Sequence, residues 1–207
     1  MLKRALVVLV AILMITSISC VKEKTNEEIY NEAQEIVMNM KSYTCIAEVV
    51  VAGNMKPQTY KMIQKFKAPD KCYIEVIEPS YIQGKKTIYN GKKSIVKQPK
   101  INQSWELNNF KNTLEANSFL GCFVYYILDT EEIVLNREEI GDKEYLRIDT
   151  NIPDDNYYFK NAKIWINIKD NTPFKLQILD GDNKIRLDIQ YNEFEYNTNI
   201  DDAIYDI

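Results

Sequence analysis

Histidine does not occur anywhere in the 207 residues of this chain. Its absence excludes catalytic pairs and triads that use imidazole as the general base, and it excludes zinc sites with histidine ligands. The sequence also lacks a nucleophile elbow, a glycine-rich phosphate loop and a serine–lysine motif. We therefore expect a protein without catalytic residues, without a metal site and without a cofactor other than a covalent lipid.

Cysteine is scarce, and its spacing does not fit the common zinc and redox motifs. The chain has four cysteines, and none of them belongs to a C-x-x-C pair. Cys45, Cys72 and Cys122 lie in apolar segments, which favours buried free thiols. A disulfide between Cys45 and Cys72 is the alternative in an exported chain.

The chain as a whole carries no large excess of either charge, and its formal net charge is −4. This mildly acidic balance argues against nucleic acid as a partner. The two halves differ, however. Residues 56–100 contain eleven lysines against three acids, or +8, and residues 129–207 contain nineteen acids against nine basic residues, or −10. Either the halves attract one another within the fold, or the lysine-rich half meets an external anionic surface.

The N-terminus has the features of a lipoprotein signal peptide. Lys3 and Arg4 precede an apolar run over residues 5–15, which ends at residues 16–20 (TSISC). We expect residues 1–19 to be removed, Cys20 to be acylated and residues 20–24 to form a short lipidated tether. The protein would then be held on the extracytoplasmic face of the cell membrane. An ordinary secretory signal followed by an incidental cysteine is the alternative.

Two segments have helical patterns. Thr25 and Glu28 have the spacing of a capping box, and they open an apolar stripe made of Ile29, Ala33, Ile36, Val37 and Met40. A second helix is predicted between Asn112 and Thr130, and residues 119–128 within it carry no charge. This helix is therefore either part of the core or a lid or docking surface for a partner.

The candidate pocket or partner surface consists of the large apolar residues of the second helix and two tryptophans from the strands. They are Phe119, Leu120, Phe123, Val124, Ile127, Trp105 and Trp165. Half-buried packing is the alternative for the two tryptophans.

The rest of the chain alternates with a period of two, which predicts successive strands. Asn90-Gly91 is the strongest hairpin signal, and residues 180–183 (DGDN) predict a β-turn rather than a calcium loop. We expect an α+β fold over residues 25–207, as a single domain. Its strongly curved antiparallel sheet would form an open half-barrel, with the concave face covered by helices.

The order of these features resembles the LolA-like lipoprotein-carrier superfamily, and in it the clostridial germination lipoproteins. The segments that carry the resemblance are residues 84–93 (GKKTIYNGKK), 164–167 (IWIN) and 172–175 (TPFK), after the lipobox and the first helix. The resemblance implies a sporulation protein that binds and activates a zinc-dependent N-acetylmuramoyl-L-alanine amidase for cortex muramic-δ-lactam formation, with the zinc on the amidase.

Three alternatives for function and assembly stay open. The superfamily also implies a lipid or lipoprotein carrier that uses an apolar concave pocket, and a sensor of the envelope is a weaker option. A homodimer is not excluded.

Overall fold

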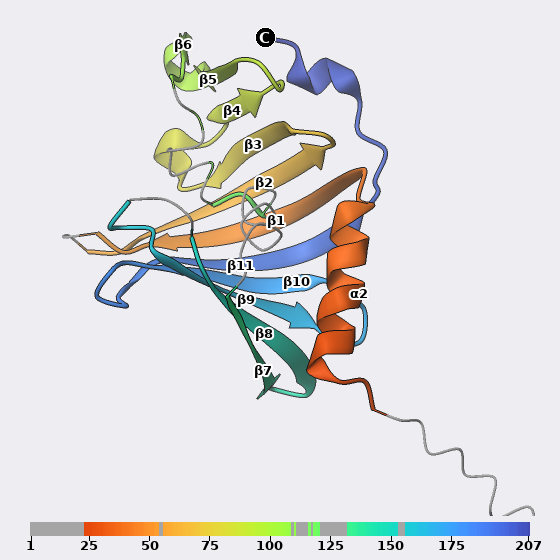
Figure 1. Ribbon diagram of the computed structural model, residues 1–207. Helices are drawn as coiled ribbons and strands as arrows, with labels where there is room; N and C mark the ends of the chain where they lie inside the picture. Colours follow the sequence, from red (N-terminus) through yellow and green to blue (C-terminus); the bar gives the residue numbers. More distant parts are fainter. Residues whose placement is uncertain are drawn as a thin grey trace, which may run out of the picture.

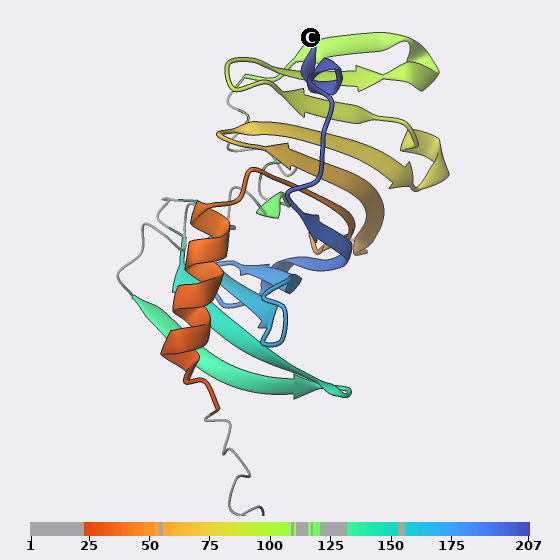
Figure 2. The same ribbon diagram turned by 90° about the vertical axis from the view of Figure 1, so that its right-hand side faces the viewer.

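The protein is described by a computed structural model, which covers residues 23–53, 56–108, 110, 116, 118–120, 132–152 and 156–207. In these residues, eleven strands form a single open antiparallel sheet in the order β6-β5-β4-β3-β2-β1-β11-β10-β9-β8-β7. Figure 1 shows the sheet as strongly twisted, and Figure 2 shows its curvature. The predicted open antiparallel sheet is thereby confirmed.

The first half of the sheet comprises β1 (Ser42–Val51), β2 (Gln58–Lys67), β3 (Lys71–Glu78), β4 (Lys86–Tyr89), β5 (Ser94–Gln98) and β6 (Gln103–Glu106). The second half comprises β7 (Ile133–Ile140), β8 (Lys143–Asn151), β9 (Asn161–Asn167), β10 (Pro173–Leu179) and β11 (Ile185–Tyr196). The described helical segments are α2 (Asn26–Met38) and the short 3₁₀ helices η1 (Ser80–Ile82), η2 (Pro99–Ile101) and η4 (Asp202–Tyr205).

One pairing joins the two halves. β1 and β11 are antiparallel neighbours, with Val49 opposite Ile189, whereas all other paired strands follow one another in the chain. Because β6 and β7 form opposite edges of the sheet, residues 107–132 connect one edge to the other. The buried residues Phe110 and Ala116 belong to this connection and to the main core cluster.

The core lies on one face of the sheet, which we call the core face. Tyr43 of β1 stacks with Phe66, Phe119 and Phe194 at centroid distances of 5.6, 5.4 and 5.0 Å. Gln64, fully buried beside this aromatic group, donates a 2.8 Å hydrogen bond from Nε2 to the backbone oxygen of Ser118. The connection between the edges is thus tied to the centre of the core face.

Helix α2 packs on the core face of the second half, where it contacts β7 and β8. The predicted capping box is present: the Glu28 amide donates to Thr25 Oγ1 at 3.2 Å, and the Thr25 amide donates to Glu28 Oε2 at 2.7 Å. Ile29 and Ala33 are buried as predicted. Ile36 and Val37 are only partly buried, whereas Tyr30, which was not part of the predicted stripe, is buried. The helix therefore buries mainly its first half.

The predicted hairpin at Asn90-Gly91 is confirmed by β4 and β5. Asn90 Oδ1 accepts hydrogen bonds from the amides of Lys92 and Lys93, and Gly91 has φ +90°. A Cβ atom at Gly91 would lie 2.6 Å from Asp70 Oδ1. Both the backbone conformation and the close approach therefore require glycine here.

The opposite side of the sheet, the outer face, carries the C-terminal segment over the lysine-rich strands (Figure 2). Tyr205 and other apolar residues of this segment pack with Tyr73 of β3. Asp202 accepts hydrogen bonds from Lys67 and Lys71 at 2.8 and 2.9 Å, which lower the pKa of its carboxyl group to about 2. Asp202 from the acidic half thus pairs with Lys67 and Lys71 from the lysine-rich half, which agrees with the alternative that the two halves attract one another within the fold.

The second predicted helix lies mostly outside the described residues, as do Cys20, Cys122, Phe123, Val124 and Ile127. The predicted cover of the concave face by helices is not confirmed; α2 is the α-helix within the described residues, and it contacts β7 and β8. In the described ranges, no helix is both long and apolar enough to cross a membrane.

Candidate functional site

The structure places the described members of the candidate surface at three different locations. Phe119 and Leu120 are buried in the core, with exposures of 1% and 3%. Trp105 lies on the edge strand β6 and is 42% exposed, whereas Trp165 on β9 is only 7% exposed. These residues therefore do not form one continuous surface.

Trp165 points to the outer face, away from Phe119. Its Nε1–H donates a 2.6 Å hydrogen bond to Glu138 Oε2, and Lys175 Nζ lies 5.5 Å from the ring centroid. The same Glu138 carboxylate pairs with Arg147. Trp165 thus has the packing role that was the alternative to a surface anchor.

The core face of the first half contains a small pocket, with a volume of about 260 Å³. It lies between β1–β4 and η1, next to Ser118 and hence beside Phe119. Its apolar lining residues are Val49, Met62, Ile74, Val76 and Ile82, and its other lining residues are Tyr60, Tyr81, Lys85, Thr87 and Ser118. Such a pocket suits a small apolar group that ends in an anion or a hydrogen-bond acceptor.

Three exposed large apolar side chains belong to the part of the chain from β3 to β6. Tyr81 of η1, Ile101 of η2 and Trp105 of β6 are exposed, and we call them the apolar edge patch. η1 and η2 are adjacent, because Lys100 Nζ donates a hydrogen bond to the backbone oxygen of Ser80. Exposed aromatic groups of this kind are enriched at protein–protein interfaces. The sequence pattern could not single out Tyr81 and Ile101, because each stands in an irregular connection.

A buried ion pair at the β10–β11 turn was not predicted from the sequence. Asp180 is fully buried, and its Oδ2 lies 2.6 Å from Arg186 Nη2 and 2.7 Å from Arg186 Nε. Burial alone would raise the pKa of the Asp180 carboxyl group. The hydrogen bonds from the Lys184 amide, Arg186 and the Asp182 amide outweigh burial and hold this pKa below its usual value. The predicted β-turn is confirmed, and the aspartate at its start organises it.

The remaining titratable groups include no cluster suited to a metal ion in the part of the chain that the structure describes. No three Cys, Asp or Glu residues there are grouped to bind a metal ion. Cys45 and Cys72 are buried free thiols, so the proposed disulfide between them is not formed.

Comparison with known proteins identifies relatives across nearly the whole chain. Residues 2–205 match the family model of YdcC-like sporulation proteins. The sporulation protein YdcC of Bacillus subtilis (strain 168) is 21% identical over 99% of this chain, and the chain spans 60% of that protein's length.

Among solved structures, the chain is similar to one in the complex of the CwlD amidase with the GerS lipoprotein from Clostridioides difficile. The identity is 35%, the TM-score is 0.51, and the match covers 85% of this chain and 98% of that one. The LolA superfamily protein NE2245 from Nitrosomonas europaea also matches, with 15% identity, a TM-score of 0.49, and coverage of 89% and 99%.

The resemblance predicted from the sequence is confirmed for a sporulation protein and for the similarity to a chain of the amidase–lipoprotein complex. The open sheet, its helix α2 and the family match over residues 2–205 agree with one another. The chain therefore belongs to the YdcC-like family of sporulation proteins.

Proposed function

We propose that this protein is a membrane-anchored, non-catalytic lipoprotein that binds and activates a cell-wall N-acetylmuramoyl-L-alanine amidase needed for cortex muramic-δ-lactam formation. The observation that carries the proposal is the 35% identity with a chain from the complex of an amidase and a lipoprotein. In this proposal the catalytic zinc and its ligands belong to the amidase, and this chain, which has no histidine, contributes binding free energy.

The apolar edge patch is the surface that we assign to the amidase. A partner that buries Trp105 and Tyr81 gains contact area from rigid aromatic rings, which are common centres of binding energy. An activator works by binding the active form of its partner more tightly than the inactive form. We expect the patch to bind the active form of the amidase more tightly than the inactive form.

The proposed anchor leaves this patch accessible. Helix α2 begins beside β7, where Arg137 forms an ion pair with Glu23 and hydrogen-bonds to Asn26, and the tether would leave the domain there (Figure 1). Trp105 of the patch lies on the edge strand β6, ten strand spacings from β7, or roughly 48 Å along the curved sheet. An amidase could therefore approach the patch without contacting the membrane.

The test is affinity capture of the full chain from sporulating cells, followed by an amidase assay of the eluate. We expect the wild type and Met38→Ala to retain amidase, because Met38 is exposed on α2, far from the patch. Trp105→Ala should retain at least about tenfold less, which corresponds to 1.4 kcal/mol. Equal capture by all three proteins would contradict the assignment of the patch. Turnover of cell-wall substrate by the purified chain alone would contradict the whole proposal.

A lipid or lipoprotein carrier is the second candidate, and the core-face pocket is the site that it would use. Residues 113–128 would then act as a lid over the concave face. The pocket that the described residues form, at about 260 Å³, is smaller than the roughly 300–1,000 Å³ of ordinary ligand pockets. Native mass spectrometry of the purified protein would detect a bound lipid, and its absence from protein purified out of membranes would argue against a carrier.

The lipid anchor on Cys20 is a separate part of the proposal. Mass spectrometry of the membrane fraction should find Cys20 as an acylated N-terminal residue, after removal of residues 1–19. Cys20→Ala should release the protein from the membrane. An unmodified Cys20 in a soluble protein would reject the anchor but not the binding of the amidase.

A further inference from the structure

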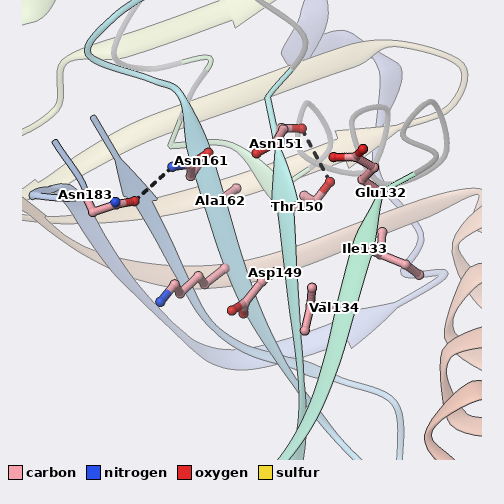
Figure 3. Close-up of a pocket in the computed structure, with 10 residues that line it drawn as sticks. Glu132, Ile133, Val134, Asp149, Thr150, Asn151, Asn161, Ala162 and Asn183 are labelled. Carbon is pink, nitrogen blue, oxygen red and sulfur yellow. Dashed lines mark hydrogen bonds between the residues drawn. The ribbon is translucent and has the colours of Figure 1, made fainter. Parts of the chain in front are cut away.

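A cleft lies at one end of β7, β8 and β9, and Figure 3 shows the residues that line it. Its volume is about 620 Å³. Val134, Asp149 and Lys163 stand opposite one another on the three strands, and they point outward because their neighbours Ile133, Ile148, Ala162 and Ile164 face the core. The other residues that line the cleft are Glu132, Ile133, Thr150, Asn151, Asn161, Ala162 and Asn183.

The lining offers hydrogen bonds of both kinds. Asn161 Nδ2 donates to Asn183 Oδ1 at 3.0 Å, which brings together β9 and the β10–β11 turn, as Figure 3 shows. An amide side chain has two donor hydrogens and an acceptor oxygen, so the Asn161–Asn183 pair, joined by a single hydrogen bond, offers further donors and acceptors to a ligand. The Lys163 ammonium group forms no hydrogen bond or ion pair with any residue in the described ranges.

Two exposed tyrosines stand beside this cleft, in the connection from β8 to β9. Tyr157 and Tyr158 are 51% and 55% exposed, and their rings meet edge to face at a centroid distance of 5.7 Å. The Arg186 guanidinium lies 5.3 Å from the Tyr158 centroid. Tyr157 lies against Gly181, where a Cβ atom would come within 2.7 Å of its ring. These contacts hold the rings in place although their surfaces remain in water.

The buried Asp180 carboxylate connects the tyrosines to the cleft. It accepts hydrogen bonds from the amides of Asp182 and Lys184 at 2.9 Å, which shapes the turn that carries Asn183. It also holds Arg186, which lies over Tyr158. Buried ion pairs commonly add little to stability compared with an apolar replacement. The pair links the turn that carries Asn183 to the Arg186 side chain that lies over Tyr158.

We propose that this cleft and the two tyrosines form a saccharide-binding site. Sugar rings present C–H faces that pack on aromatic rings, and their hydroxyl and N-acetyl groups donate and accept hydrogen bonds as asparagine does. The outer face from Val134 on β7 to Arg186 on β11 spans four strand spacings, roughly 19 Å, which accommodates a short oligosaccharide.

The ligand that fits best is a β-linked amino-sugar chain of the cell wall. The clustered amides match its N-acetyl groups, and this choice of source rests on the proposed function. The protein would then hold the glycan strand near the amidase that acts on it.

The test is a titration of purified full-length protein with chitotetraose, followed by saturation-transfer NMR. The wild type should bind saturably. Tyr158→Ala and Asn161→Ala should each weaken binding by about tenfold, whereas Tyr158→Phe, which keeps the ring, should bind like the wild type. Met38→Ala is the control for loss of an exposed apolar side chain elsewhere, and unchanged circular dichroism of each variant confirms folding.

Cellotetraose, which lacks N-acetyl groups, should bind several-fold more weakly than chitotetraose. Equal binding of the two sugars would overturn the amino-sugar assignment. Absence of saturable chitotetraose binding by the folded wild type, or full binding by Tyr158→Ala, would overturn the site. This titration contains no amidase, so it is independent of the capture experiment. Binding of chitotetraose without capture of an amidase would reject only the proposed function. Capture of an amidase without binding of chitotetraose would reject only this site.

Discussion

Replacing Phe119 by alanine should unfold the protein at a much lower temperature. Phe119 was a candidate for a partner surface, but its side chain is 1% exposed and packs against Tyr43 and Phe66 at centroid distances of 5.4 and 6.0 Å. Truncation of a buried phenylalanine costs about 3–5 kcal/mol, since it removes apolar contacts and leaves a cavity. For a domain of this size we expect the melting temperature to fall by about 6–20 °C.

The measurement is thermal unfolding followed by circular dichroism, with Met38→Ala as the matched control. Met38 is the most exposed large apolar side chain of α2, so its removal should change stability by no more than about 0.5 kcal/mol. A loss below about 1 kcal/mol for Phe119→Ala, together with weaker capture of the amidase, would refute the assignment of Phe119 to the core. It would restore Phe119 to the partner surface.

Three further predictions follow from local geometry. Gly91→Ala should destabilise the protein by about 1–3 kcal/mol in urea titrations, because φ is +90° there, whereas Gly53→Ala, which meets no atom within 4 Å, should be nearly neutral. The pKa of Asp202 is lowered to about 2, so the stability that its carboxylate contributes should be complete above about pH 4 and lost as the pH falls to about 2. The melting temperatures of the wild type and Asp202→Asn should therefore converge below about pH 2. The Cys45 and Cys72 side chains are buried, and burial also raises the pKa of the Cys45 thiol. Iodoacetamide should therefore alkylate neither thiol until urea unfolds the protein, as peptide mapping would show. Modification of either thiol in the native protein would contradict this burial.

Features set by near neighbours in the chain could be predicted from the sequence. The capping box of Thr25 and Glu28 involves residues three apart, and the Asn90-Gly91 hairpin depends on the backbone freedom of one glycine. Strand alternation is equally local, because successive side chains point to opposite faces. Such patterns therefore located most of the strands and the start of α2.

The distribution of residues between the two faces could not be predicted in the same way. Trp165 and Phe119 are both aromatic residues in apolar segments, yet they lie on opposite faces of the sheet. The face of a strand depends on its register with strands far away in the chain, and a shift of one residue would exchange the faces. The sequence alone therefore placed both residues on one candidate surface.

The Asp180–Arg186 pair was missed for a related reason. A DGDN segment predicts a solvated turn, and nothing near it in the sequence indicates that its first carboxylate is buried. Tyr157 and Tyr158 reach this turn from the preceding β8–β9 connection. The packing of Tyr157 against Gly181 therefore brings this connection close to Asn183, which lines the cleft.

The neighbouring positions of β1 and β11 have a consequence for the order in which the protein folds. Each half of the sheet is a succession of hairpins that can form soon after synthesis, because the contacting residues are close in sequence. The seam between them requires a loop closure of more than a hundred residues, and β11 is the last strand made. A ribosome or translocase that still holds residues 185–196 would therefore keep the two meanders apart, so release of that final strand should set the rate at which the native sheet is completed.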